Sequence, residues 1–142
     1  MATSTYLSNP VVLIGATSAS TTDITDQVSA CTLTVLKEAL EDTSFGKTSR
    51  TMTGGLFSNS CTLSVYASYA TSESYSVLSA LQGTKCYIKV NPAAGADSAT
   101  NPGFELTDCY MESLPVVNAS LGTLSVYDIE LQGGVYSVDT TP

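Results

Sequence analysis

Two short segments of nearly the same sequence bracket a long polar stretch, and this arrangement constrains the fold most strongly. Cys31-Thr-Leu-Thr-Val35 precedes the stretch and Cys61-Thr-Leu-Ser-Val65 follows it. In both segments Cys, Leu and Val alternate with hydroxyl residues, which is the period of a strand with one buried face. Hairpin loops are mostly about two to five residues long, so an excursion over residues 36–55 is unusual. We expect this excursion to project from the fold and to reach a partner, which favours a role in assembly.

The middle of the excursion predicts an exposed turn. The run Asp42-Thr-Ser-Phe-Gly46 places Phe45 at the tip, and Gly46 can adopt the positive φ that other residues avoid. An aromatic side chain on a polar tip is expected to enter a pocket, either on a partner or, if the tip folds back, on its own domain. The residues before the turn, 36–41, are compatible with a helical turn or with a continued strand.

The remaining sequence predicts further strands and one helix. Strands are expected at residues 11–14, 26–35, 85–90, 104–117, 121–131 and 135–138, with the pair Gly54-Gly55 ending the excursion and residues 17–22 forming a loop. A helix is expected at 71–82, with Thr71 as its cap and Gly83 after its end. The fold class predicted is therefore mostly β, an antiparallel β-sandwich or barrel of about six or seven strands with one packed α-helix and a long inter-strand loop.

The length suits one domain over residues 1–142. Within it, residues 1–10 are predicted to be a flexible or docking arm that ends at Pro10. Residues 91–103, which contain two Asn-Pro steps and many small side chains, are predicted to be a mobile loop.

Composition argues against several functional classes. The chain has 13 acidic and 5 basic residues, a net charge of −8, so it is not expected to grip a phosphate backbone. It has no His, no Gly-rich phosphate loop and four scattered cysteines, which argues against an enzyme, a metal site and a bound cofactor. The cysteines are expected to be buried thiols.

The sequence pattern predicts neither a secretory signal nor a membrane span. The start of the chain lacks the basic and apolar regions of a secretory signal, and the apolar run at 11–14 is far shorter than a membrane span. We therefore expect synthesis in a reducing cytoplasm and no membrane span.

One predicted strand has an acidic face. Tyr127, Ile129 and Leu131 alternate with Asp128 and Glu130, so both carboxylates share one side of the strand. Such a face is ordinarily solvated. In a closed ring it could instead line a channel.

From about residue 11 to residue 136, the chain resembles the major tail tube proteins of long-tailed bacteriophages, a family related in fold to type VI secretion tubes. The matching features, in order, are Leu40-Glu-Asp-Thr43 before Phe45-Gly46, then Arg50, Gly55-Leu56, the helix with Tyr75, Leu78 and Leu81, Asn101-Pro-Gly-Phe104, and Gly133-Gly134. One departure is Ser64-Val-Tyr-Ala67, where related sequences often carry an acidic residue.

The resemblance implies a structural virion protein. Copies of the chain would form stacked, hexameric rings that conduct DNA without binding it specifically, in a tail assembled with a tape measure protein and with terminator and distal tail proteins. The residues implied in contacts between subunits or rings are Leu40, Asp42, Phe45, Gly46, Arg50, Gly55 and Leu56, with Phe45 as an anchor and Arg50 in an ion pair. Asp128 and Glu130 would line the lumen.

Two other functions fit the same pattern. A capsid decoration protein or other virion β-domain would form trimers or monomers on a shell. A binding module of immunoglobulin type would be a monomer that does not need residues 38–55.

Overall fold

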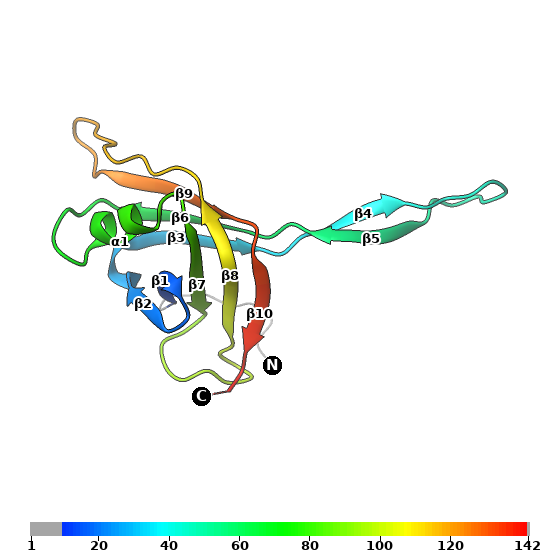
Figure 1. Ribbon diagram of the computed structural model, residues 1–142, viewed down its shortest axis with the longest axis horizontal. Coiled ribbons are helices and arrows are strands. Elements are labelled where there is room, and N and C mark those ends of the chain that lie inside the picture. Colours follow the sequence, from blue (N-terminus) through cyan, green and yellow to red (C-terminus); the bar gives the residue numbers. More distant parts are fainter. Residues whose placement is uncertain (1–9, 142) are drawn as a thin grey trace.

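The computed structural model describes residues 10–141, which form a strand-rich body and a long hairpin that extends from one end of it (Figure 1). Most of the expected arm, residues 1–10, therefore lies outside the described residues. The strands are β1 Val11–Thr17, β2 Ser20–Asp23, β3 Val28–Thr34, β4 Lys37–Glu41, β5 Met52–Phe57, β6 Ser60–Tyr66, β7 Lys85–Asn91, β8 Gly103–Met111, β9 Val126–Gln132 and β10 Val135–Asp139. The helices are η1 Thr25–Gln27, a short 3₁₀ turn, and α1 Ser74–Leu81.

The body is one antiparallel sheet folded into two layers. Its strand order is β2-β1-β7-β8-β9-β6-β3, and β10 pairs with β8 on a separate branch. β8 and β9 share only the pairs Tyr110↔Gln132 and Met111↔Leu131, so the sheet turns a corner there. Beyond the corner, β3, β6 and β9 cross over β7 and β8 at a steep angle (Figure 1). The mostly β class with one packed helix, predicted from the sequence, is confirmed.

The core lies between these two layers and follows the period-two pattern. Cys61, Leu63 and Val65 of β6 are fully buried, and so are Tyr127 and Leu131 of β9. Register pairs Leu63 with Ile129 and Val65 with Tyr127, so the apolar side chains of both strands face the same interior. The helix closes one end of this core with Leu78 and Leu81, as its apolar spacing predicts.

Several predicted boundaries were wrong, and the helix start is the clearest case. Thr71 does not cap the helix, because Ser72 has a φ of 63° and the first helical residue is Ser74. The Ser74 hydroxyl accepts a hydrogen bond from the Ser68 backbone N–H (2.9 Å) and donates one to the Tyr66 carbonyl (2.7 Å). These bonds tie the helix start to the end of β6. At the other end, Gly83 follows the helix as predicted, and its φ is +78°.

The strands also differ from expectation in number and length. The hydroxyl-rich stretch expected to be a loop contains β2, which pairs with β1. β8 ends at Met111 and β9 begins at Val126, so the segment between them, which includes Pro115, is not strand. Gly54 and Gly55 lie inside β5 and do not end the excursion. Short polar strands and strand ends carry too little periodicity to be located from sequence.

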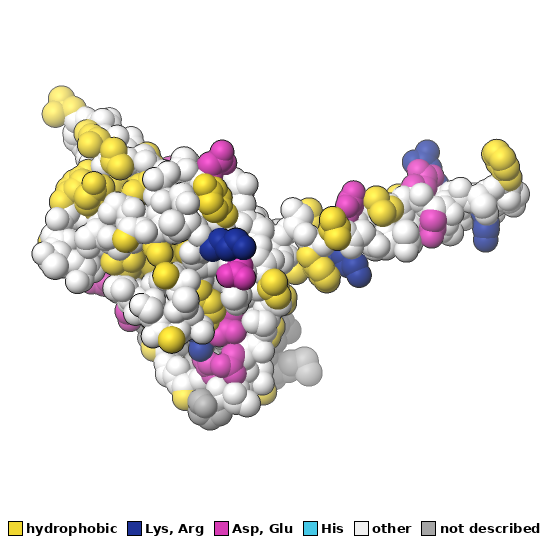
Figure 2. Space-filling model, in the orientation of Figure 1, with side chains coloured by type: hydrophobic (Ala, Val, Ile, Leu, Met, Phe, Trp, Pro, Cys, Tyr) yellow, Lys and Arg dark blue, Asp and Glu magenta, His cyan; other side chains and the backbone are white. Residues whose placement is uncertain are grey.

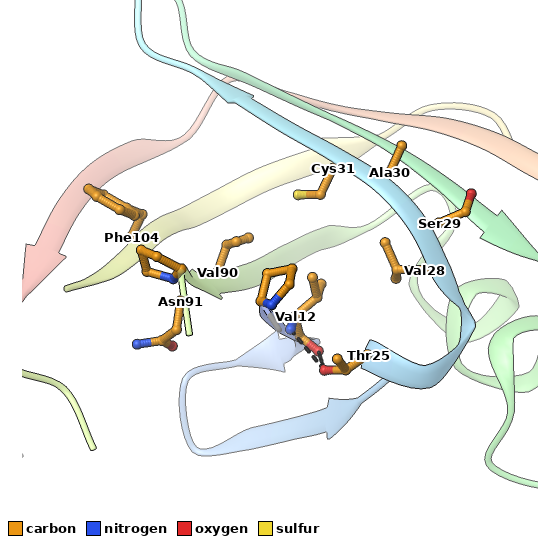
Figure 3. A pocket seen from close by; sticks show the side chains of 11 residues that line it. Val12, Thr25, Val28, Ser29, Ala30, Cys31, Val90, Asn91 and Phe104 are labelled. Atoms are coloured by element: carbon orange, nitrogen blue, oxygen red, sulfur yellow. Dashed lines mark hydrogen bonds between the residues drawn. The ribbon is translucent and has the colours of Figure 1, made fainter. Parts of the chain in front are cut away.

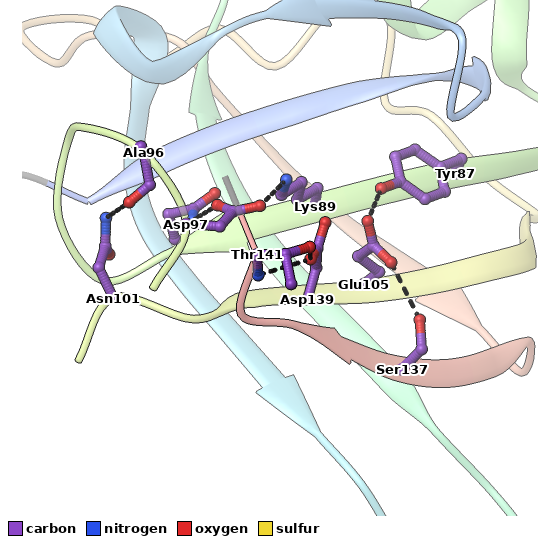
Figure 4. Close-up of polar contacts among 10 residues, drawn as sticks. Tyr87, Lys89, Ala96, Asp97, Asn101, Glu105, Ser137, Asp139 and Thr141 are labelled. Carbon is purple, nitrogen blue, oxygen red and sulfur yellow. Dashed lines mark hydrogen bonds and ion pairs between the residues drawn. The ribbon is translucent and has the colours of Figure 1, made fainter. Parts of the chain in front are cut away.

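The segment between β7 and β8 is tied to the body by one carboxylate (Figure 4). Asp97 accepts hydrogen bonds from Lys89 Nζ and Asn91 Nδ2, both at 2.6 Å. The side chains of the Lys89–Asp97 pair are largely buried, and the bond to Asp97 is the main cause of the raised pKa of Lys89. Mobility of residues 91–103 stays a prediction, now with a defined anchor at Asp97.

All four cysteines are free thiols that pack in the sheet. Cys86 and Cys109 face each other across β7 and β8, with their Sγ atoms 3.6 Å apart. Cys31 and Cys61 lie 3.9 Å apart at the Sγ atoms, and Cys31 alone of the four is only partly buried. The hydrogen bond with Cys31 and burial both raise the pKa of Cys61, which keeps its thiol neutral at physiological pH.

We predict that Leu63→Ala lowers the free energy of unfolding by about 2–5 kcal/mol, because it leaves a cavity in a fully buried site. Urea denaturation of the monomer measures this change. The matched control is Thr62→Ala on the exposed side of the same strand, which should cost less than about 0.5 kcal/mol. Equal effects from the two variants would contradict the assignment of the inner and outer faces.

Candidate assembly surface

The excursion is a β-hairpin that forms a sheet of its own. β4 and β5 pair with each other only, through Lys37↔Phe57, Leu40↔Thr53 and Glu41↔Met52. Residues 36–41 are thus mainly strand, which decides between the two alternatives left open by the sequence. The pairing continues toward the tip, because the Asp42 backbone N–H donates to the Thr51 carbonyl at 3.0 Å. A two-stranded sheet without a packed face is marginal in water, so this hairpin gains stability from any partner that covers it.

The hairpin tip presents Phe45 to solvent. The Lys47 backbone N–H lies 3.4 Å from the Ser44 carbonyl, which closes a turn with Gly46 at a φ of +87°. Phe45 is fully exposed, with a relative accessibility of 109%. The side chain therefore does not fold back onto its own domain, as one of the two predictions for it would require.

Apolar side chains continue along the hairpin from its base to its tip (Figure 2). The exposed large apolar residues on this segment are Val35, Leu36, Leu40, Phe45, Met52, Leu56 and Phe57. Three of them, Leu40, Phe45 and Leu56, belong to the predicted contact set. Exposed apolar surface on this scale is typical of an interaction site.

The other predicted contact residues have roles inside the hairpin. Arg50 Nε lies 3.9 Å from Glu41 Oε1 on the opposite strand, with both side chains exposed. Such a long surface pair adds little stability, so Arg50 remains available to a partner. A Cβ on Gly55 would lie 2.9 Å from Glu38 Oε2, so Gly55 contacts the opposite strand of its own hairpin. Asp42 is exposed and joins the hairpin ladder through its backbone.

Charge is divided unevenly between hairpin and body. Residues 36–57 contain three of the five basic residues and three of the 13 acidic ones, so this segment is neutral. The rest of the chain has two basic and ten acidic residues, which account for the whole net charge of −8. Lys47 and Arg50 make the tip, residues 43–51, locally positive. The hairpin tip and the body thus have complementary charge.

Asp128 and Glu130 lie on the outer, exposed face of β9. Register places Ser64 opposite Asp128 and Thr62 opposite Glu130, and Ser64 Oγ donates to Asp128 Oδ1 at 2.8 Å. The segment Ser64-Val-Tyr-Ala67 has no acidic residue, and the carboxylate that Ser64 binds stands on the adjacent strand. The segments that form β3, β6 and β9 contain no Lys or Arg. This outer face therefore carries hydroxyls and carboxylates without a compensating cation of its own.

A second apolar surface lies at the opposite end of the body from the hairpin (Figures 1 and 2). It consists of the exposed residues Tyr69, Val116, Val117, Leu121 and Leu124. The Tyr69 hydroxyl donates to the Val116 carbonyl at 2.7 Å, which joins the segment between β6 and α1 to the segment between β8 and β9. Sequence reasoning missed this surface because Val116, Val117, Leu121 and Leu124 were assigned to strands and Tyr69 was assigned to no element. The signal that could have revealed it was the proline in the apolar run 114–117, because a proline tends to end a strand.

Within residues 10–141, no cluster of three or more His, Cys, Asp or Glu side chains is arranged to hold a metal ion. In the same part of the chain, no helix has the length and apolar content needed to cross a membrane.

Comparison with solved structures identifies the architecture. The chain superposes on the SPP1 tail tube protein with a TM-score of 0.74, at 12% identity, covering 93% of this chain and 77% of that one. It superposes on a chain of the sheath/tube terminator of the extracellular contractile injection system PVC with a TM-score of 0.69, at 15% identity, covering 98% and 99%. A chain from the tail of a gene transfer agent particle gives 0.61, at 12% identity, covering 98% and 100%. The chain has the tail tube fold.

The likeness extends over nearly the whole chain. At the level of sequence, no protein-family model and no curated protein matches the chain. The likeness is therefore carried by the backbone, and at 12–15% identity it shows the fold and not the function.

We predict that Phe45→Ala leaves the stability of the isolated monomer unchanged within about 0.5 kcal/mol, because the side chain is fully exposed. Thermal or urea unfolding at low protein concentration measures this. Val65→Ala, at a fully buried position, is the positive control and should be clearly destabilising. A loss of more than about 1 kcal/mol on removing Phe45 would show that the tip packs on the body in solution.

Proposed function

We propose that this chain is the subunit of a phage tail tube, a structural virion protein whose copies stack as rings around a channel for DNA. The observation that carries the proposal is a fully exposed phenylalanine at the tip of a hairpin that the tail tube fold projects away from its body. The fold supports the class of assembly, and the hairpin supplies the means of contact between copies.

The two ends of the molecule favour head-to-tail stacking. The hairpin and the apolar surface at 116–124 are different surfaces at opposite ends of the body. An interface between unlike surfaces repeats without closing when copies are related by translation and rotation along one axis, and this generates a filament. Apolar surface at both ends would then be buried by neighbours.

Ring formation would use the free strand edges. β2 and β3 end the main strand order, and β10 has one partner, β8. Such edges carry unpaired backbone groups that can pair with another copy, and closure into a barrel removes them. We propose six copies per ring, the number implied by the family resemblance. A related tail, that of the gene transfer agent particle, was determined with C6 symmetry.

The outer face of β3, β6 and β9 is the best candidate for the channel wall. It carries Asp128 and Glu130 among hydroxyl residues, and its strands have no basic residue. Six copies at −8 would give 6 × −8 = −48 per ring. A wall of this sign repels phosphate groups, so DNA would pass without binding. The proposal includes no catalytic step and no cofactor.

The proposed location is the virion tail, after synthesis in the host bacterial cytoplasm. A tape measure protein and terminator and distal tail proteins are the proposed partners, following the family resemblance. A capsid decoration protein or a monomeric binding module is the competing assignment, and the assembly experiments below separate them.

We expect purified protein, alone or with its tail initiator, to form tubes in negative-stain images. Phe45→Ala should raise the protein concentration needed for tubes about thirtyfold or more, since a buried aromatic anchor typically contributes about 2 kcal/mol or more. Thr48→Ala, a change at another exposed residue of the tip, is the control and should assemble more nearly as the wild type does. Trimers or single particles from wild-type protein under all these conditions would refute the tube assignment.

We expect Asp128→Lys with Glu130→Lys to slow or block DNA ejection while tubes still form, because cations on the wall would hold phosphate groups. Phage carrying the changes would be compared for tail morphology and for DNA release triggered in vitro. Asp128→Asn with Glu130→Gln is the milder control. Wild-type ejection by the Lys variant would place these residues away from the channel.

A further inference from the structure

We propose that Phe45 of one copy docks in a groove of a second copy, between β3 and the neighbouring ends of β1, β7 and β8. This inference rests on the proposed tube function and names the surface that receives the hairpin tip. It predicts which residues meet in the contact between copies.

The groove is an apolar cavity of about 300 Å³ where the two layers of the body diverge (Figure 3). For comparison, an apolar protein cavity of roughly 150 Å³ is large enough to bind benzene. Its walls are Val12 from β1, Val28 and Cys31 from β3, Val90 from β7 and Phe104 from β8. A phenyl ring therefore has both the room and the apolar surroundings it requires.

Two polar groups that line the groove, one on Val12 and one on Asn91, already have hydrogen-bond partners. The Val12 backbone N–H donates to Thr25 Oγ1 at 3.0 Å, and Asn91 Nδ2 donates to Asp97 at 2.6 Å. An apolar side chain can thus enter without stripping these groups of their partners, which would otherwise cost free energy. The site suits an aromatic ring better than a polar ligand.

The charges around the groove also favour the hairpin tip as its occupant. Exposed Asp23 and Asp26 flank Thr25 at the edge of the groove. Phe45 is followed by Lys47 and Arg50 on an otherwise uncharged tip. A docked Phe45 would therefore bring two basic side chains to the acidic edge of the groove. Complementary charge around an apolar centre steers association and sets orientation. Lys89, the basic residue near this end of β7, is already paired with Asp97.

A second apolar cavity fits the tip less well. It has a volume of about 220 Å³ and is lined by Phe57, Asn59, Gly134, Val135 and Tyr136, next to the base of the hairpin. No acidic residue lies within one position of this lining in the sequence. It therefore offers less room for a ring than the groove does, and no carboxylate adjoins its lining along the chain.

Photo-cross-linking tests the contact directly. A benzophenone amino acid at position 45, mixed with wild-type protein so that tubes still form, would be activated by light and located by mass spectrometry. Cross-links to 28–31, 90–92 or 104 of another copy are expected. Cross-links to 57 and 134–136, to residues 1–9 or to nothing within formed tubes would overturn the proposal.

Cys31 provides a second test because it lines the groove and is the most accessible cysteine. Alkylating native monomer with N-ethylmaleimide should fill the groove and reduce tube formation at least tenfold, while circular dichroism shows an intact fold. Cys31→Ala treated in the same way is the matched control and should assemble. Normal assembly of protein labelled at Cys31 would overturn the proposal.

Exchanging the charges of Asp26 and Lys47 tests the orientation of the docked tip. Asp26→Lys should weaken assembly several-fold, and adding Lys47→Glu in the same chain should restore it, because the pair would be re-formed with opposite polarity. Lack of rescue, with each single variant folded, would count against this orientation of the tip. Failure of wild-type protein to form tubes would instead refute the proposed function, so the two failures are distinguishable.

Discussion

Burial of alternate side chains on β6 and β9 is the constraint on which the rest of the molecule depends. Leu63, Val65 and Tyr127 point into the space between the layers and leave no accessible surface. Because the period of a strand is two, this choice also sends Thr62, Asp128 and Glu130 to the outside. A slip of one residue would exchange the two faces, so the packing of the core and the acidic outer surface are set by the same interaction.

The hairpin has the opposite character, since it has no core of its own. Its two strands are held by their mutual pairing, and its apolar residues face solvent along its length. The body that supports it carries the full negative charge, while the tip carries Lys47 and Arg50. Under the proposed assembly, stability and recognition are thus placed in different parts of the chain, which allows residues at the tip to vary without a direct effect on folding.

Sequence reasoning recovered the features that have strong local periodicity or turn chemistry. The duplicated Cys-Thr-Leu pattern located β3 and β6, Gly46 marked the tip turn, and the alternation after residue 126 separated Asp128 from Tyr127. It did not find β2, which is short and polar, or the apolar end surface around Leu121. These features depend on contacts between distant segments, such as the bond from Tyr69 to Val116, and no local pattern encodes them.

The unlike ends of the molecule have a consequence for how such an object would stop growing. In the proposed stacking, a subunit with a protruding tip at one end and a receiving groove on its body presents the same unfilled groove after every addition. Nothing in the geometry of the subunit would limit the number of copies added, because each added layer would be equivalent to the one before it. The final dimension of the particle would therefore have to be dictated by another molecule, and the shape of this chain would determine only the direction of growth.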